Sequence, residues 1–232
     1  MNKIILITGA TSGFGKAIAE KFAAEGNTII LCARNKEKLE SFADELKPSG
    51  ATILTYAADL SKKEDAVAFG NWCLQHCTAD VLVNNAGSFV PGSIYNEADG
   101  NLETMIEVNL YSAYHLTRVL LPKMIERKTG HIFNMCSIAS LKAYDNGGSY
   151  SISKFALAGF SKNLREELKP HNIKVTAVYP GAVYTDSWSG SGVAPDRIME
   201  SKDIAGMIYA AAHLSPQACV EEIVLRPQLG DL

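Results

Sequence analysis

The chain has 232 residues, of which 47% are hydrophobic and 20% are charged, and its formal net charge is −3. This balance is typical of a globular protein and excludes an intrinsically disordered chain, which would be more polar. Lysine and arginine are spread along the sequence, so no basic patch is visible that could neutralise the phosphates of a nucleic acid. We therefore expect no nucleic-acid partner, and a single α/β domain over residues 1–232.

The cysteines and the N-terminal residues bear on compartment and metal binding. Five scattered cysteines are unlike the dense framework of a small secreted domain. Cys73 and Cys77 are four residues apart, but no second Cys or His pair with ligand spacing follows, so we predict no metal site. The apolar run 4–7 is too short for a signal peptide or a membrane span. We expect a cytoplasmic protein in a reducing compartment, with no membrane partner.

Short β-branched runs alternate with longer stretches of helical periodicity along the whole chain. Strands are expected at 3–8, 28–33, 51–57, 80–84, 130–136, 173–179 and 219–225. Helices are expected at 13–25, 35–47, 61–77, 101–127, 149–169 and 201–213. This alternation predicts an α/β fold with repeated βαβ units and a parallel sheet.

The first strand runs directly into a glycine-rich segment, and a helix begins at once. Glycines permit a tight turn there and let a pyrophosphate approach the backbone N–H groups at the positive end of the helix. A glycine-rich turn without a ligand is the alternative. The candidate cofactor-binding residues of this segment are Gly9, Thr11, Ser12, Gly13, Phe14 and Gly15.

The second strand ends at Ala33 and Arg34, where NAD-binding folds place an acid on the ribose 2′-hydroxyl. Ala33 carries no charge that would repel a 2′-phosphate, and Arg34 can pair with one through its planar guanidinium. The alternative for Arg34 is a solvated charge at the start of a helix. The sequence thus predicts NADP(H) as the cofactor, preferred over NAD(H).

Further cofactor contacts are expected where the third and fourth strands end, because open α/β sheets bind ligands at the carboxyl ends of their strands. Asp59 and Leu60 follow the third strand, and Asn85, Ala86 and Gly87 follow the fourth. Ordinary turn chemistry also favours Asp, Asn and Gly at such positions.

Tyr150 and Lys154 are four residues apart on an expected helix, so their side chains share one face. A nearby ammonium stabilises a phenolate, and a phenol whose pKa is lowered in this way can give a proton to a carbonyl or take one back. Ser137 ends the preceding strand, where its hydroxyl could hold the substrate oxygen. The alternatives are a polar strand terminus for Ser137 and a solvated helix charge for Lys154.

Asn109 interrupts a long apolar helical run, although asparagine is unfavourable in a helix interior. Such a break can mark function, or the side chain can simply face solvent. Asn109 is therefore a fourth candidate catalytic residue.

The stretch from Tyr184 to Glu200 is rich in serine and glycine and has no regular period. A loop of this length in a compact domain is commonly a lid or a binding loop, and a surface excursion is the alternative. Trp188 favours a substrate lid near 184–200, because tryptophan is unusual in a solvated tether.

Together these motifs resemble the short-chain dehydrogenase/reductase family over essentially the whole chain. The resemblance implies a three-layer Rossmann fold, with a seven-stranded parallel sheet of order 3-2-1-4-5-6-7 and helices on both faces. It implies that Asn109, Ser137, Tyr150 and Lys154 form the catalytic tetrad, with Lys154 also binding the nicotinamide ribose and Asn109 holding a water that relays protons. It further implies cofactor contacts after the sixth strand, at Pro180, Gly181, Val183 and Thr185. Many NADP-preferring relatives carry a basic residue where this chain has Ser12, so the cofactor assignment rests mainly on Arg34.

The implied activity is NADP-dependent hydride transfer between the nicotinamide and a small carbonyl or alcohol. Segments 180–188 and 221–227 resemble bacterial sepiapterin reductases, which favours a sepiapterin-like pteridine or a diketone as substrate. The alternatives are a 3-oxoacyl thioester reductase and, from another class, a non-catalytic NADP-binding regulatory protein. Relatives usually assemble through the helices corresponding to 101–127 and 149–169, so we expect a homodimer or homotetramer.

Overall fold

The computed structural model describes residues 2–185 and 192–232. Its main feature is a parallel sheet of seven strands in the order β3-β2-β1-β4-β5-β6-β9, which confirms the predicted order with β9 as the seventh strand. The strands are β1 (Ile4–Thr8), β2 (Thr28–Ala33), β3 (Thr52–Ala57), β4 (Val81–Asn84), β5 (Gly130–Met135), β6 (Ile173–Pro180) and β9 (Glu222–Leu225). The last strand begins later than predicted, because Cys219 and Val220 instead make the contacts with β6 described below.

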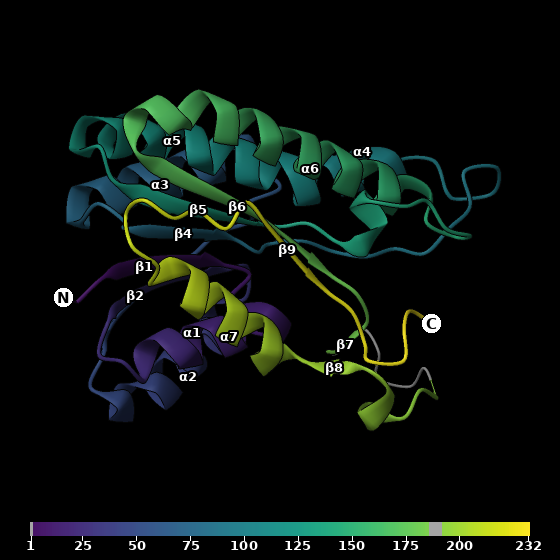
Figure 1. Cartoon of the computed structure of the whole chain (residues 1–232), viewed down its shortest axis with the longest axis horizontal. Coiled ribbons are helices and arrows are strands. Elements are labelled where there is room, and N and C mark those ends of the chain that lie inside the picture. Colours follow the sequence, from purple (N-terminus) through teal and green to yellow (C-terminus); the bar gives the residue numbers. More distant parts are fainter. Residues whose placement is uncertain (1, 186–191) are drawn as a thin grey trace.

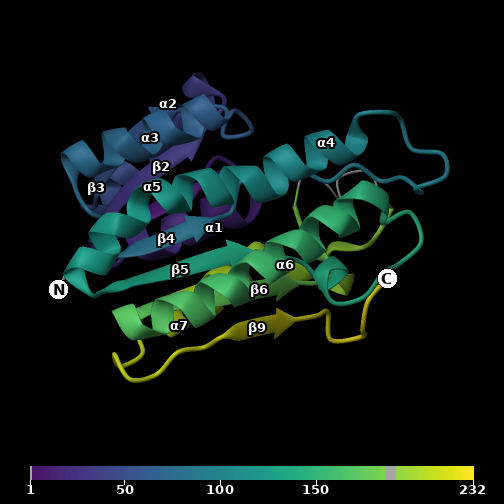
Figure 2. The same cartoon turned by 90° about the horizontal axis from the view of Figure 1, so that it is seen from above.

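Helices cover both faces of this sheet (Figure 1). They are α1 (Gly13–Ala23), α2 (Lys36–Leu46), α3 (Lys63–His76), α4 (Asn101–Ile106), α5 (Ser112–Arg127), α6 (Gly148–Leu168) and α7 (Ser201–Ala212). Helices α1, α2 and α7 lie on one face, and α3, α4, α5 and α6 lie on the other (Figure 1, Figure 2). The predicted three-layer arrangement is therefore confirmed.

Strand β1 shows how the two layers are built. Ile5 and Ile7 belong to the core cluster beneath α1, α2 and α7, whereas Leu6 belongs to the cluster on the opposite face. All three side chains are completely buried, because alternate residues of a strand point to opposite faces and both faces are covered by helices. This explains why the strand is an uninterrupted apolar run rather than an alternating one.

The chain reverses its direction of travel across the sheet at β1. Strand β1 pairs in parallel with β2 on one side and with β4 on the other. The connections from these two neighbouring strands therefore leave in opposite directions, which opens a crevice at their carboxyl ends.

The predicted helix 101–127 is two helices joined by a π-helical stretch, Glu107–Tyr111, between α4 and α5. The prediction of one regular helix was wrong here, because the wider turn carries Asn109, whose side chain bonds to neighbouring segments instead of facing solvent. Such π-turns are frequent at functional sites.

The predicted irregular loop 184–200 has regular structure at both ends. Two short strands, β7 (Val183–Tyr184) and β8 (Met199–Glu200), pair in parallel, and a 3-10 turn covers Pro195–Arg197. Backbone pairing between the two ends overrides the weak local preferences of the sequence. Residues 186–191, which include Trp188, lie outside the described part of the chain, so the lid stays a prediction.

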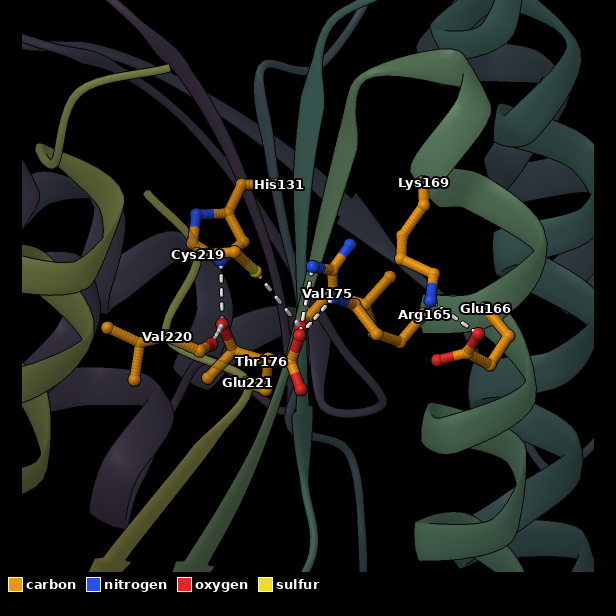
Figure 3. A network of polar contacts seen from close by, with 9 residues as sticks. All are labelled: His131, Arg165, Glu166, Lys169, Val175, Thr176, Cys219, Val220 and Glu221. Atoms are coloured by element: carbon orange, nitrogen blue, oxygen red, sulfur yellow. Dashed lines mark hydrogen bonds and ion pairs between the residues drawn. The ribbon is translucent and has the colours of Figure 1, made fainter. Parts of the chain in front are cut away.

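A closed polar network lies toward the amino end of β5 (Figure 3). The Thr176 hydroxyl donates to the Val220 carbonyl oxygen at 2.5 Å, and the His131 Nε2 lies 2.7 Å from the same hydroxyl oxygen. Because the Thr176 hydroxyl already donates its only proton to Val220, the His131 Nε2 must donate to the Thr176 hydroxyl oxygen. Burial lowers the pKa of His131 to about 3, so the ring is neutral at physiological pH. The Cys219 thiol adds a contact to the Val175 carbonyl oxygen at 3.7 Å.

No helix within residues 2–185 and 192–232 combines the length and the apolar character needed to span a bilayer.

Candidate active site

A cavity of about 510 Å³ lies in the crevice at the carboxyl ends of the strands. Its size is in the range typical of sites for small ligands and cofactors. It brings together most of the residues that the sequence predicts for the cofactor: Gly9, Thr11, Ser12, Gly13, Phe14, Arg34, Asp59, Leu60, Asn85, Ala86, Gly87, Tyr150, Lys154 and Thr185.

Four predicted cofactor residues do not line this cavity: Gly15, Pro180, Gly181 and Val183. A Cβ on Gly15 would lie 2.2 Å from the Gly9 carbonyl oxygen, so this residue packs beneath the turn instead of facing a ligand. The Gly181 N–H donates to Leu225 on β9 at 2.8 Å, and Val183 is a core residue. These residues support the cavity wall from behind, a role that motif spacing does not distinguish from direct contact.

The turn between β1 and α1 forms one end of the cavity. Among the residues that the structure describes, no side chain caps the N-terminus of α1, and its first turn holds no acidic residue, so its N–H groups can bind an anion. Asn85 holds the turn, because its Nδ2 donates to the carbonyl oxygens of Thr8 at 2.9 Å and Gly9 at 3.0 Å. Thr8 was missed by the sequence reasoning, although its hydroxyl oxygen accepts from the N–H groups of Asn85 and Ala86.

Positive charge gathers where β2 leads into α2. Arg34 and Lys38 both line the cavity and are exposed. In the part of the chain that the structure describes, Lys36 pairs with Glu40 at 3.7 Å, whereas neither Arg34 nor Lys38 forms a salt bridge. Lys38 was also missed, although its position one helical turn after Arg34 could have pointed to it.

Asn109 is 1% exposed, which rules out the solvent-facing alternative. Its Oδ1 accepts from the Ser88 N–H at 2.8 Å, and its Nδ2 donates to the Ser88 carbonyl oxygen at 3.1 Å. The same Nδ2 also donates to the Ser153 hydroxyl at 2.9 Å. The asparagine therefore links the start of the 88–100 segment to α6.

Lys154 and Tyr150 project from α6 to the inner end of the cavity. The Lys154 Nζ donates to the Met135 carbonyl oxygen at 2.8 Å and lies 5.8 Å from the centroid of the Tyr150 ring. Lys154 is only 6% exposed, so the alternative of a solvated helix charge is wrong. Tyr150 forms a hydrogen bond with Ser137, whose Oγ also accepts from the Ala139 N–H at 3.1 Å.

Burial dominates the protonation of this pair. It raises the pKa of Tyr150 to about 12, against the opposing effect of the hydrogen bond with Ser137. It lowers the pKa of Lys154 to about 8. The expectation that the ammonium lowers the phenol pKa is wrong for this arrangement, because Nζ lies over the ring and bonds to Met135. Tyr150 is consequently a neutral phenol at physiological pH, able to donate a proton.

Phe89 forms a wall beside the phenol and was not predicted. Its ring meets the Tyr150 ring edge-on, with centroids 4.8 Å apart, and 47% of the residue is exposed. An exposed aromatic side chain beside a reactive phenol can pack against an apolar or flat ligand.

The comparisons with known proteins agree with this geometry. The family model described as short chain dehydrogenase matches residues 3–193, which is most of the chain. The chain belongs to the short-chain dehydrogenase family. Within it, the sepiapterin reductase of Chlorobaculum tepidum is 33% identical over 244 residues, which cover 100% of this chain and 99% of that protein.

Solved structures of two dehydrogenases superpose closely on this chain. An alcohol dehydrogenase of Thermococcus sibiricus in complex with 5-hydroxy-NADP has a TM-score of 0.90 at 28% identity, covering 98% of this chain and 97% of that one. A serine dehydrogenase in complex with NADP+ also has a TM-score of 0.90, at 27% identity, covering 99% of this chain and 96% of that one. The fold is thus shared by dehydrogenases with different substrates.

Proposed function

We propose that this short-chain dehydrogenase is an NADP(H)-dependent oxidoreductase that transfers a hydride between the nicotinamide and a small carbonyl or alcohol. The observation that carries the proposal is the presence of Tyr150 and Lys154 in the lining of a cavity that also presents the turn before α1 and Arg34. Ser137 does not line this cavity but forms a hydrogen bond with Tyr150. Fold alone would not support an activity, whereas this set of groups suits proton and hydride transfer to one carbon–oxygen bond.

The residues present fit a dinucleotide. The N–H groups at the start of α1 suit a pyrophosphate, and Arg34 and Lys38, which form no salt bridge with any residue that the structure describes, suit a 2′-phosphate. Lys154 donates one N–H to the Met135 carbonyl oxygen and has further N–H groups that could bind ribose hydroxyls. Thr185 lies near Gly13, where it could contact the nicotinamide carboxamide. The NADP complexes of the Thermococcus alcohol dehydrogenase and the serine dehydrogenase support this assignment. The bound cofactor would supply the hydride.

The chain's own residues would handle the proton. The Tyr150 phenol donates its proton to the carbonyl oxygen in the reductive direction, and the phenolate accepts it back in oxidation. The Ser137 hydroxyl holds the same oxygen, since it already bonds to Tyr150. Asn109 fixes the neighbouring Ser153 and Ser88, and in this way keeps the wall of the site in place.

The cofactor preference is tested by titrating NADPH and NADH against the wild type and the variants Arg34→Ala and Lys38→Ala. Loss of either cation should weaken NADPH binding about tenfold and NADH binding less than about twofold, because only NADPH carries the 2′-phosphate. Lys36→Ala is the matched control, since Lys36 pairs with Glu40 and does not line the cavity. A clear preference of the wild type for NADH would overturn the assignment.

Within this activity we propose a sepiapterin-like pteridine or a diketone as substrate. The full-length similarity to the Chlorobaculum sepiapterin reductase supports it, as do Phe89 and the half-exposed Tyr184, which could stack on a flat ring. Assays of sepiapterin, diketones and acetoacetyl thioesters with NADPH separate this from a 3-oxoacyl thioester reductase. Absence of sepiapterin turnover would remove the narrower proposal. NADPH binding without turnover of any carbonyl would favour the non-catalytic regulatory protein.

We also propose a cytoplasmic homodimer or homotetramer. Apolar side chains are exposed on the helical layer that contains α5 and α6. More than two fifths of the surface is exposed at Tyr111, in the π-turn before α5, and at Ile152 and Phe155 of α6. Apolar side chains gathered in this way suit a symmetric interface between copies. Sedimentation only as 25.0 kDa particles would contradict the oligomer.

A further inference from the structure

One acidic side chain outside the cavity makes contacts that the proposed chemistry does not explain. Between residues 94 and 100, every residue is exposed except Glu97, which is half-buried. The Ser149 hydroxyl donates to one oxygen of the Glu97 carboxylate at 2.6 Å, and the Ser149 N–H donates to the other at 3.2 Å. Ser149 itself is 1% exposed. The carboxylate therefore bonds to a buried residue far away in sequence.

These contacts cap the N-terminus of α6. The residue before the helix is Gly147, which has no side chain and so no side-chain cap. The first N–H groups of any helix lack partners within it, and a carboxylate there is stabilised further by the helix dipole. Glu97 supplies both the hydrogen-bond acceptor and the charge from a separate segment.

The backbone at this contact is closely fitted. Gly148 has φ +33°, and a Cβ there would lie 2.3 Å from the Gly92 carbonyl oxygen and 2.9 Å from the Glu97 carboxylate. The Gly92 N–H donates to the Asn146 carbonyl oxygen at 3.1 Å. The 88–100 segment thus lies against the turn before α6, beside the start of that helix (Figure 1, Figure 2).

The capped turn carries the phenol. Tyr150 directly follows Ser149 in the first turn of α6. The other end of the 88–100 segment is held by Asn109 through Ser88, and the next residue, Phe89, packs against the Tyr150 ring. The segment is therefore fastened on both sides of Tyr150, by Asn109 at its start and by Glu97 near its end.

We propose that Glu97 is a positioning residue for Tyr150, acting through Ser149 and the first turn of α6 without touching substrate or cofactor. The inference rests on the proposed role of Tyr150 as the proton donor. Without the carboxylate the first turn frays, and the phenol oxygen no longer stays within hydrogen-bond distance of Ser137. Small displacements of a reacting group are costly to the rate, even when binding is intact.

The test compares Glu97→Ala, Ser149→Ala and the double variant with the wild type, using NADPH and whichever carbonyl the wild type reduces best. We expect kcat to fall about 10- to 100-fold in Glu97→Ala, while the Kd of NADPH stays within about twofold. The double variant should lose no more kcat than Glu97→Ala, because Glu97→Ala already removes the hydrogen bond with the Ser149 hydroxyl that Ser149→Ala breaks. Glu97→Gln, which keeps one acceptor oxygen, should recover part of kcat. Glu103→Ala is the matched control, as an exposed glutamate of α4 with no partner among the described residues.

Hydrogen exchange gives a readout that needs no activity. Amides 148–151 should exchange faster in Glu97→Ala, with protection of the central strands unchanged. Unchanged exchange there, a kcat within about twofold of the wild type, or a loss of protection throughout the sheet would each overturn the proposal. If the wild type itself reduces no carbonyl, the proposed function fails, and the exchange result still decides whether Glu97 caps the helix.

Discussion

Two groups of polar side chains at opposite ends of the sheet have different surroundings. Toward the amino end of β5, the His131 ring, the Thr176 hydroxyl and the Val220 carbonyl form a closed chain of hydrogen bonds (Figure 3). At the carboxyl ends of the strands, the buried Lys154 and the half-buried Tyr150 face a cavity of about 510 Å³. Burial favours the neutral form of the titratable group in both places.

The difference lies in what remains available for a ligand. In the closed network the His131 Nε2, the Thr176 hydroxyl and the Val220 carbonyl bond to one another, so they can contribute to stability. In the crevice, the phenol and the ammonium retain hydrogen-bonding capacity that points into open space. A perturbed pKa therefore indicates function only where the group also faces a cavity.

The substitution expected to distinguish the two regions most clearly is Tyr150→Phe. Loss of the proton donor should lower kcat by about 10²- to 10⁴-fold, with the Kd of NADPH within about twofold of the wild type. Steady-state kinetics and cofactor titration measure both. Tyr179→Phe is the matched control, because Tyr179 is completely buried, bonds to Glu222 at 3.4 Å and does not line the cavity. Equal losses in the two variants would mean that the phenol of Tyr150 has no special part in the reaction.

The opposite pattern is expected for His131→Ala. The ring stacks on Phe133 with centroids 3.9 Å apart and is hydrogen-bonded to Thr176. Its removal should lower the free energy of unfolding by about 2–4 kcal/mol and leave kcat nearly unchanged. Urea denaturation measures the change, with the half-buried His171→Ala as control. A large fall in kcat with unaltered stability would show that the closed network is coupled to the site.

The two regions should also differ in how they respond to alkali. Because burial lowers the pKa of Lys154 from 10.5 to about 8, the free enzyme loses this ammonium above that pH, whereas Tyr150 keeps its proton until about pH 12. For carbonyl reduction, kcat/KM should be level below about pH 8 and then fall roughly tenfold per pH unit. A profile that stays flat to pH 10 would show that the ammonium keeps its proton in the free enzyme.

Acid should affect the closed network through stability. The folded-state pKa of His131, about 3, lies below its ordinary value of 6.5, so between these two values the unfolded chain binds the extra proton. The stabilisation is complete above pH 6.5 and declines toward pH 3, by up to about 1.4 kcal/mol per pH unit. Urea unfolding at pH 7 and pH 4.5 should therefore show a shallower loss in His131→Ala than in the wild type. Equal losses of stability in the two proteins would contradict the lowered pKa of His131 in the folded state.

Several features could be predicted because their signals are local. The apolar run of β1 followed by glycines, the change of period at each helix, and the four-residue spacing of Tyr150 and Lys154 depend only on neighbouring residues. Asn109 stood out because its helix propensity conflicts with its position, and the π-turn and its bonds to Ser88 and Ser153 account for that conflict.

Other features depend on segments that are distant in sequence. Phe89 meets Tyr150, and Glu97 meets Ser149, only because the sheet brings the ends of β4 and β5 together. The same holds for the direction of the pKa shifts, since the sequence favoured a phenol acidified by Lys154 whereas the structure places that ammonium against Met135.

The sequence by itself determined the strand–helix order, the glycine turn and the residues able to carry the chemistry, because periodicity and backbone preference act over a few residues. Only the tertiary structure decided which of these residues line the cavity, which support it from behind, and how strongly water is excluded from each. Solvation and long-range hydrogen bonds depend on the packing of distant segments, and no local pattern encodes them.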